Sequence, residues 1–365
     1  MQDSKLKFCL VAVDAMSLDK TRSVFIATAV ILILSAVIPT MHVKAQNIDI
    51  QNVNAVNLTW FGFTAFEIAT VDYSSVVYAN PNIWLYNQSS AFGVKLKPQY
   101  ESPDALAQFL KEKNSENIVI TLTNDHPDEI GDLFELAAAF QKAKLDYKIV
   151  AQSDLARNWL IPELTKREID PNVVLRIGYG GKVTIGDVGI IATLALHGST
   201  PWPISMIIEL NGVRIWHTGG TAIFSDMTLI RRLYEPQIAL ISITDAQFSM
   251  GPREAGYATR LLRPEIAIPT HYLASEGQFA GVSTLKDVED FQKYVQEFSF
   301  SKVKVVVLTL GEPFSYTAKQ VTQSHEIVQS SVKTSEQDQT MYLAGTGIMA
   351  FAAGIAASKI FSRKK

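Results

Sequence analysis

The sequence predicts an α/β fold in which mixed β-sheets are covered by helices. Strand-like runs near the start of the body follow one another as hairpins, whereas later runs alternate with helical patterns. Asn211-Gly212 lies between two apolar runs, which is a strong signal for a two-residue hairpin turn. Hydrophobic residues make up 47% of the 365 positions, enough for a large core.

The individual elements follow from the period of the apolar residues. Strand patterns cover residues 57–68, 75–79, 117–123, 188–196, 205–210, 213–217, 238–243, 266–269 and 303–308. Helical patterns cover residues 103–113, 130–144, 224–233, 252–262 and 288–298. Residues 151–186 show no pattern that we can assign, and whether they form a lid stays open.

Composition excludes several classes of function and of site. The net charge of −3 and the lack of a basic stripe exclude a nucleic-acid partner. Cys9 is the single cysteine, so the chain forms no internal disulfide and no cysteine-based zinc site. Any metal must therefore bind to histidine and carboxylate side chains.

Both ends of the chain resemble membrane segments. Residues 24–39 are apolar and follow Lys20 and Arg22, which predicts a signal peptide or an uncleaved N-terminal anchor over 1–45. After a globular body at 46–316, a polar stalk over 317–340 leads to a transmembrane helix at 341–360 and a basic cytoplasmic tail at 361–365. This pattern predicts a protein that the C-terminal helix anchors in the membrane, with its body outside the cytoplasmic membrane. The oligomeric state stays open.

Polar residues follow four of the predicted strands. The strand at 117–123 ends in Asn124-Asp125-His126-Pro127-Asp128-Glu129, and His197, His217 and His271 each stand at the end of another apolar run. Since α/β proteins place their chemistry at the carboxyl ends of strands, this loop, His197 and His271 are candidates for a hydrolase metal site, and His217 is expected to support it or to pack beside it.

In order and spacing, five segments resemble the metallo-β-lactamase superfamily, and most closely its ascorbate-phosphate-lactonase-like metal-dependent hydrolases. The segments are residues 60–66, 123–132, 216–221, 248–255 and 269–272. The resemblance covers residues 57 to about 315 and implies an αβ/βα sandwich, that is, two mixed sheets flanked by helices.

The resemblance also implies a set of metal ligands, of which this chain retains a part. It keeps His126, Asp128, His197 and His271, and it carries Glu129 where the last loop histidine belongs. Asn124 replaces the first loop histidine, and Gly220 replaces the aspartate that bridges two metals. Two cations held close together need that bridging anion, so we expect at most one metal.

Two functions remain open at this point. In the first, His126, Asp128, Glu129, His197 and His271 hold one zinc or manganese ion, and Asp128 is a ligand or a general base. The protein would then hydrolyse an ester, a lactone or a phosphoester. In the second, the chain is catalytically inactive, holds no metal, and serves as a surface module that binds a small molecule or supports an assembly. Asp245 is a further candidate carboxylate.

Overall fold

The computed structural model describes residues 54–85, 95–244, 249–272, 283–299 and 302–318, which belong to one compact unit that begins at Asn54. Two mixed sheets of seven strands each form its centre. Sheet A contains β1 (Ala55–Gly62), β2 (Ala65–Thr70), β3 (Ser75–Ala79), β4 (Asn117–Thr121), β5 (Tyr147–Gln152), β6 (Val174–Ile177) and β14 (Pro313–Thr317), in the order β14-β1-β2-β3-β4-β5-β6. Sheet B contains β7 (Lys182–Ile185), β8 (Val188–Leu194), β9 (Ile204–Leu210), β10 (Val213–His217), β11 (Ile238–Ser242), β12 (Ile266–Thr270) and β13 (Lys304–Val305), in the order β13-β12-β11-β10-β9-β8-β7.

Each sheet combines antiparallel hairpins with a parallel part. In sheet A, β3 to β6 pair in parallel, and in sheet B, β10 to β13 do so. The hairpin predicted at Asn211-Gly212 joins β9 to β10, with Val213 paired to Leu210, and both turn residues have positive φ as a type I′ turn requires. The parallel strands direct their carboxyl ends toward one edge, which is where the candidate site lies.

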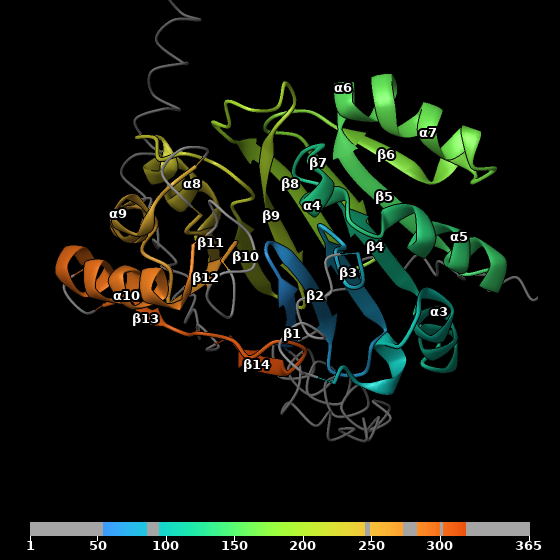
Figure 1. Ribbon diagram of the computed structural model, residues 1–365, viewed down its shortest axis with the longest axis horizontal. Coiled ribbons are helices and arrows are strands. Elements are labelled where there is room, and N and C mark those ends of the chain that lie inside the picture. The colour runs from blue at the N-terminus through green and yellow to red at the C-terminus, as the bar shows by residue number, and fades with distance from the viewer. Residues whose placement is uncertain (1–53, 86–94, 245–248, 273–282, 300–301, 319–365) are drawn as a thin grey trace, which may run out of the picture. The chain divides into compact units, whose positions relative to one another are not determined.

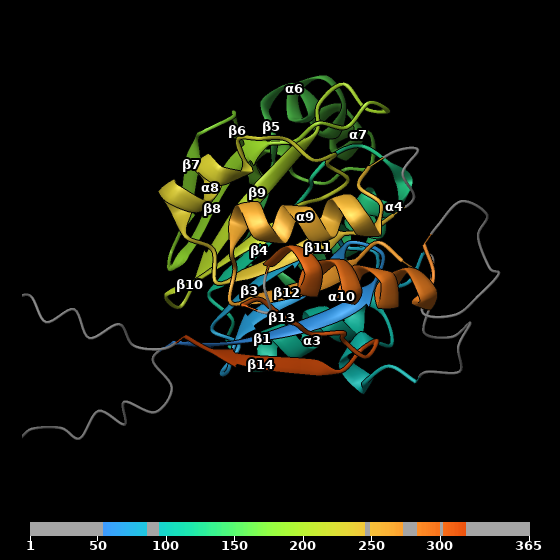
Figure 2. The ribbon, with the colours of Figure 1, turned by 90° about the vertical axis from the view of Figure 1, so that its left-hand side faces the viewer.

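Helices cover the outer face of each sheet, as Figures 1 and 2 show. Beside sheet A lie α3 (Pro103–Glu112), α5 (Leu133–Ala143), α6 (Ser153–Leu155), the π-helical turn η3 (Ala156–Leu160) and α7 (Ile161–Lys166), and beside sheet B lie α8 (Met227–Tyr234), α9 (Pro252–Leu262) and α10 (Leu285–Ser299). One apolar core fills the space between the sheets and continues beneath α9 and α10, and a second lies between sheet A and its helices. The two mixed sheets flanked by helices that the sequence predicts are therefore confirmed.

The segment 151–186 belongs to the sheets rather than to a lid. It contains the end of β5, the helical turns α6 to α7, and the strands β6 and β7. Because β6 is the last strand of sheet A and β7 the last strand of sheet B, this segment completes one edge of both sheets.

The expected fold class included a C-terminal transmembrane helix, and it is wrong in this respect for the residues that the structure describes. Within the described residues, no helix is long and apolar enough to cross a bilayer. Among the described helices α10 is the longest; it has 15 residues and carries several charged side chains, whereas a spanning helix needs about 20 apolar residues. The segments 24–39 and 341–360 lie outside the described residues. The expected location, anchored in the membrane with the body outside, depended on that helix and is corrected with it.

Candidate metal centre

Four strand ends from the two sheets meet at the candidate site. Sheet A contributes the loop after β4, and sheet B contributes the residues after β8, β10 and β12. Two backbone hydrogen bonds fasten the sheets together here: Ile204 N–H donates to Thr123 O at 2.8 Å, and His271 N–H donates to Phe63 O at 2.8 Å. The sequence-predicted residues are thus brought to one edge by the packing of the two sheets.

The loop after β4 is shaped by its own side chains. The side-chain oxygen of Asn124 accepts a hydrogen bond from the His126 N–H at 2.8 Å. His126 is the extended residue before the one-turn helix α4 (Pro127–Ile130), and Pro127 begins that helix. Asp128 and Glu129 therefore follow in the first turn, directly beside the His126 ring.

Glu129 is the most unusual residue of the loop. Its side chain is completely buried, and neither carboxyl oxygen forms a hydrogen bond of normal geometry within the described part of the chain, although the side chains of Asn124 and Asp128 lie close enough to act on its pKa. One oxygen lies 4.0 Å from His126 Nδ1. Burial, and next the charge of Asp128, raise the pKa of Glu129 well above its ordinary value. An ionised carboxylate in such a place is costly unless a cation accompanies it.

The ring of His126 presents one nitrogen to this carboxylate. Its Nε2 lies 3.2 Å from the carbonyl oxygen of Ser199. Since a carbonyl only accepts, Nε2 is assigned the proton and Nδ1 the lone pair. That Nδ1 lies 3.2 Å from Nε2 of His197. Two imidazoles on one tetrahedral zinc ion, each about 2.1 Å from it, hold their nitrogens about 3.4 Å apart. The observed spacing fits such a pair.

Asp128 and His271 form a second pair. Asp128 Oδ2 lies 3.0 Å from His271 Nε2, and the other ring nitrogen of His271 lies 3.3 Å from the Ser242 hydroxyl. Burial acts to raise the pKa of Asp128, but the hydrogen bond and the charge of His271 outweigh it and hold that pKa well below its ordinary value. Asp128 is therefore ionised at neutral pH.

The structure places three of the five predicted site residues close together and the other two beside them. Ligand atoms of His126, Asp128 and Glu129 all lie within 4.8 Å of one another. His197 and His271 flank this group, since each contacts one of its members. The donors are two carboxylates and three imidazoles, a set suited to zinc or manganese, and the buried Glu129 oxygens fit a bound cation.

A second metal does not fit the same geometry. A Cβ atom placed on Gly220 would lie 2.9 Å from His197 Nε2, so the imidazole covers the position from which a bridging carboxylate would extend. The Asn124 side chain, at the position of a lost histidine, is engaged with the backbone of its own loop. Both departures agree with the expectation of at most one metal.

Several supporting residues were not recognised as such from the sequence. Asn80 donates to Thr64 and Thr123 and accepts from the Thr123 N–H, and so fixes the start of the loop. Asp132 accepts from the N–H groups that follow Asn82. The motif carried a signal for both residues, because Asn80 precedes Pro81 and Asp132 ends the loop pattern. Asp245 lies outside the described residues.

Comparison with known proteins identifies relatives of the chain. Residues 102–272 match the model of the beta-lactamase superfamily domain. A UPF0173 metal-dependent hydrolase of Staphylothermus marinus is 34% identical over 224 residues, which cover 61% of this chain and 89% of that protein.

Solved structures agree with this relationship. Igni18, described as a novel metallo hydrolase from Ignicoccus hospitalis, has a TM-score of 0.54 and 25% identity over 73% of this chain and 100% of that one. YhfI from Bacillus subtilis, described as a metallo-beta-lactamase fold protein, has a TM-score of 0.51 and 14% identity over 72% of this chain and 100% of that one. The two sheets and their helices are thus those of the metallo-β-lactamase fold.

Proposed function

Because the chain belongs to the family of UPF0173 metal-dependent hydrolases, we propose that it is a hydrolase that uses at most one divalent metal ion. The substrate is a small molecule with an ester, lactone or phosphoester bond. One observation carries the proposal: Glu129 is fully buried, and its two oxygens form no hydrogen bond of normal geometry in the described part of the chain, next to a histidine nitrogen that bears a lone pair. That arrangement favours a cation between them.

The ligands that we propose are His126 through Nδ1, His197 through Nε2 and Glu129, with Asp128 and His271 beside them. Ser199 orients the first of these, since its carbonyl oxygen fixes the tautomer of the His126 ring. When bound, zinc or manganese supplies Lewis acidity toward a carbonyl or phosphoryl oxygen and lowers the pKa of water.

Asp128 is the residue that we propose to take a proton from the attacking water. Its carboxylate is ionised, and His271 holds one of its oxygens at 3.0 Å. Its side chain is 24% exposed, whereas that of Glu129 is fully buried, so water and substrate can reach Asp128. His271 is held in turn by Ser242, which keeps the pair in one orientation.

Metal content and hydrolysis together test this proposal. After the full chain is loaded with zinc or manganese, we expect about one ion per chain by elemental analysis. Glu129→Gln should weaken metal binding by at least about tenfold. Glu135→Gln, on the exposed face of α5, is the matched control and should bind as the parent does. With model esters, lactones and phosphodiesters, Asp128→Asn should reduce the hydrolysis rate by about a hundredfold or more.

Three outcomes would contradict the proposal. Absence of stoichiometric metal after loading would make the chain a non-catalytic module, the alternative that Asn124 and Gly220 raise. Unchanged metal affinity in Glu129→Gln would show that the buried carboxylate is not a ligand. Two ions per chain would disprove the single-metal assignment.

A further inference from the structure

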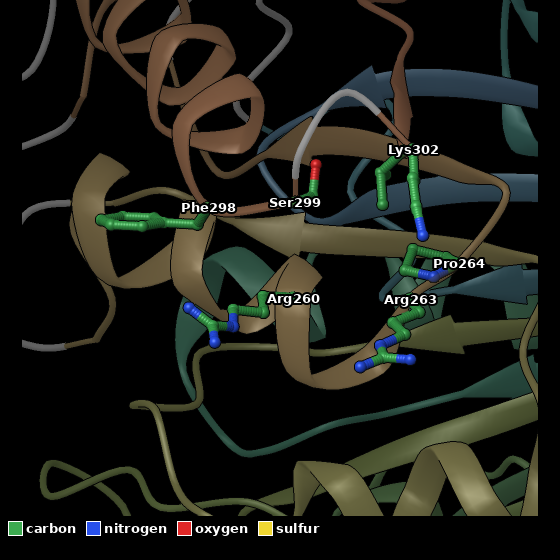
Figure 3. A pocket seen from close by; sticks show the side chains of 7 residues that line it. Arg260, Arg263, Pro264, Phe298, Ser299 and Lys302 are labelled. Carbon is green, nitrogen blue, oxygen red and sulfur yellow. The ribbon is translucent and has the colours of Figure 1, made fainter.

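A cavity lies between the carboxyl ends of α9 and α10, away from the metal cluster. Its volume is about 450 Å³, and its lining includes the buried residues Pro264 and Val303. Figure 3 shows Arg260, Arg263 and Lys302 around it, with Phe298 at one side. β12 begins beside this cavity and ends beside His271, so the five residues of that strand, about 16 Å, separate the two sites.

The charges around the cavity are of one sign. Arg260, Arg263 and Lys302 are exposed, and the residues that line the cavity include no aspartate or glutamate. Within the described parts of the chain, neither Arg263 nor Lys302 forms an ion pair within 4.0 Å. Like charges brought together around a hollow favour an anion in it.

A neighbouring cavity extends the same charge. It has a volume of about 540 Å³ and shares Arg263 with the first. Together the two cavities are lined by six basic side chains and by two acidic ones, Glu235 and Glu265. Glu235 is already within 3.8 Å of Arg214. The chain as a whole has a net charge of −3, so this is a local concentration of positive charge against the overall balance.

Helix electrostatics explain a part of this arrangement. Arg260 lies in the last turn of α9, where a cation is favoured by the negative end of the helix. The last turn of α10 has no basic residue, and Lys302 lies beyond that helix. Arg263 follows α9 with φ of +50° and caps the helix through its backbone N–H, which leaves its guanidinium group to the cavity. The helix ends therefore account for one of the three cations.

Phe298, which forms an apolar wall of the cavity, packs against two tyrosine rings. The Phe298 ring lies edge-on to Tyr257, at 5.4 Å between centroids, and parallel to Tyr294 at 5.9 Å. Arg260 lies 5.6 Å from the centre of the Tyr257 ring. A flat apolar surface thus stands beside the cations, which suits a ligand with an organic body and an anionic group.

We propose that this cavity binds a small phosphorylated molecule, whose phosphate Arg263 and Lys302 contact and whose organic part packs against Phe298. The planar guanidinium group matches two phosphate oxygens, and the lysine ammonium adds a point charge. A volume of about 450 Å³ suits a ligand of nucleotide size. The site takes its ligand independently of the metal centre.

Calorimetric titration of the metal-free full chain at low salt tests the proposal, with adenosine 5′-monophosphate, pyrophosphate, citrate and uncharged adenosine as probes. We expect both phosphate compounds to bind, adenosine to bind at least about tenfold more weakly, and the affinity to fall as salt rises. Arg263→Asn and Lys302→Gln should each reduce the affinity about tenfold. Asparagine is chosen because it tolerates positive φ.

Controls separate this site from nonspecific attraction. Arg176→Gln removes an exposed arginine from β6 and should bind the probes as the parent does. Circular dichroism checks that each variant is folded. If Arg263→Asn fails to fold, the affinity of Lys302→Gln alone tests the proposal. Equal binding of adenosine and its monophosphate, tighter binding of citrate than of either phosphate compound, or unchanged affinity in both variants would overturn the proposal.

Discussion

At the scale of single residues, the surroundings of each carboxyl group set its pKa in the candidate metal centre, so two groups of the same type differ. No hydrogen bond of normal geometry reaches the Glu129 oxygens in the described residues, whereas Asp128, one position earlier, is hydrogen-bonded to His271. The first carboxyl group has a raised pKa because burial dominates, and the second a lowered one because its partner outweighs burial. The two adjacent acids therefore suit the different tasks that we propose for them, Glu129 as a ligand and Asp128 as a base.

Gly220 allows a direct test of the space around His197. In Gly220→Ala the new Cβ would lie 2.9 Å from His197 Nε2, so the ring must shift, which disturbs its 3.2 Å spacing from His126 Nδ1. We expect metal affinity to fall about tenfold to a hundredfold, the range seen when the surroundings of a ligand are disturbed. Elemental analysis and competition with a chelator measure it.

Gly198→Ala is the matched control for this substitution. A Cβ atom at Gly198 meets nothing within 4 Å, and the residue is also a neighbour of His197 in the chain. Its metal affinity should stay that of the parent. If Gly220→Ala bound metal as tightly as Gly198→Ala, His197 would not be held where a ligand is needed.

At the scale of elements, a buried carboxyl group ties three parts of the sheet A layer together. Glu67 on β2 accepts hydrogen bonds from Tyr78 on β3 at 2.9 Å, from Tyr73 at 3.0 Å, and from Tyr100 in the short helix η2 (Pro98–Tyr100) at 2.7 Å. Burial raises the pKa of Glu67 although the three phenols act to lower it. The cluster fixes η2 against the sheet, and the free-energy cost of burying its carboxyl group depends on pH.

Glu67→Gln should remove that dependence. Because the pKa is raised in the folded state, the stability that the carboxyl group contributes is full below its ordinary pKa of 4.5 and is lost as pH rises through the folded value. We expect the variant to gain stability relative to the parent between pH 5 and pH 8, measured by urea unfolding. Glu116→Gln, an exposed residue, should show no such gain. If the free energies of unfolding of Glu67→Gln and the parent differed by a constant amount across this pH range, this account would be contradicted.

At the scale of the whole molecule, elements with a strong apolar period could be predicted from the sequence, and elements that depend on distant contacts could not. β3, β10 and α9 have the predicted bounds. Residues 57–68 read as one strand, but the chain turns at Gly62 and Phe63, both with positive φ, and forms β1 and β2. β14 was missed because it is an edge strand whose residues are mostly exposed, and only pairing with β1 reveals it.

The candidate site shows the same division. Residue types and spacing were sufficient to select His126, Asp128, Glu129, His197 and His271. The contact between Asp128 and His271 joins residues 143 positions apart and depends on how the two sheets pack. The lack of a hydrogen bond of normal geometry at the Glu129 oxygens depends on the tertiary packing around them, which no local sequence pattern records.

His217 is a histidine whose task is to hold the two sheets together, and its titration should be visible in the stability of the whole molecule. From β10 its Nε2 donates to the carbonyl oxygen of Thr64 in sheet A at 2.8 Å, and its Nδ1 accepts from the Gly219 N–H at 3.3 Å. Both nitrogens are thus hydrogen-bonded to backbone groups, so we assign this histidine a structural role. Burial lowers the pKa of His217 from 6.5 to about 4.

Between these two values the unfolded chain binds a proton that the folded chain does not, so the free energy of unfolding should fall as pH drops from 6.5 toward 4. The full loss is about 3 kcal/mol, from about 1.4 kcal/mol for each unit of the shift. His217→Asn cannot titrate and should flatten this part of the curve, even though it is less stable at neutral pH. Urea unfolding at several pH values measures both slopes, and an equally steep decline in the variant would assign the acid sensitivity to other groups.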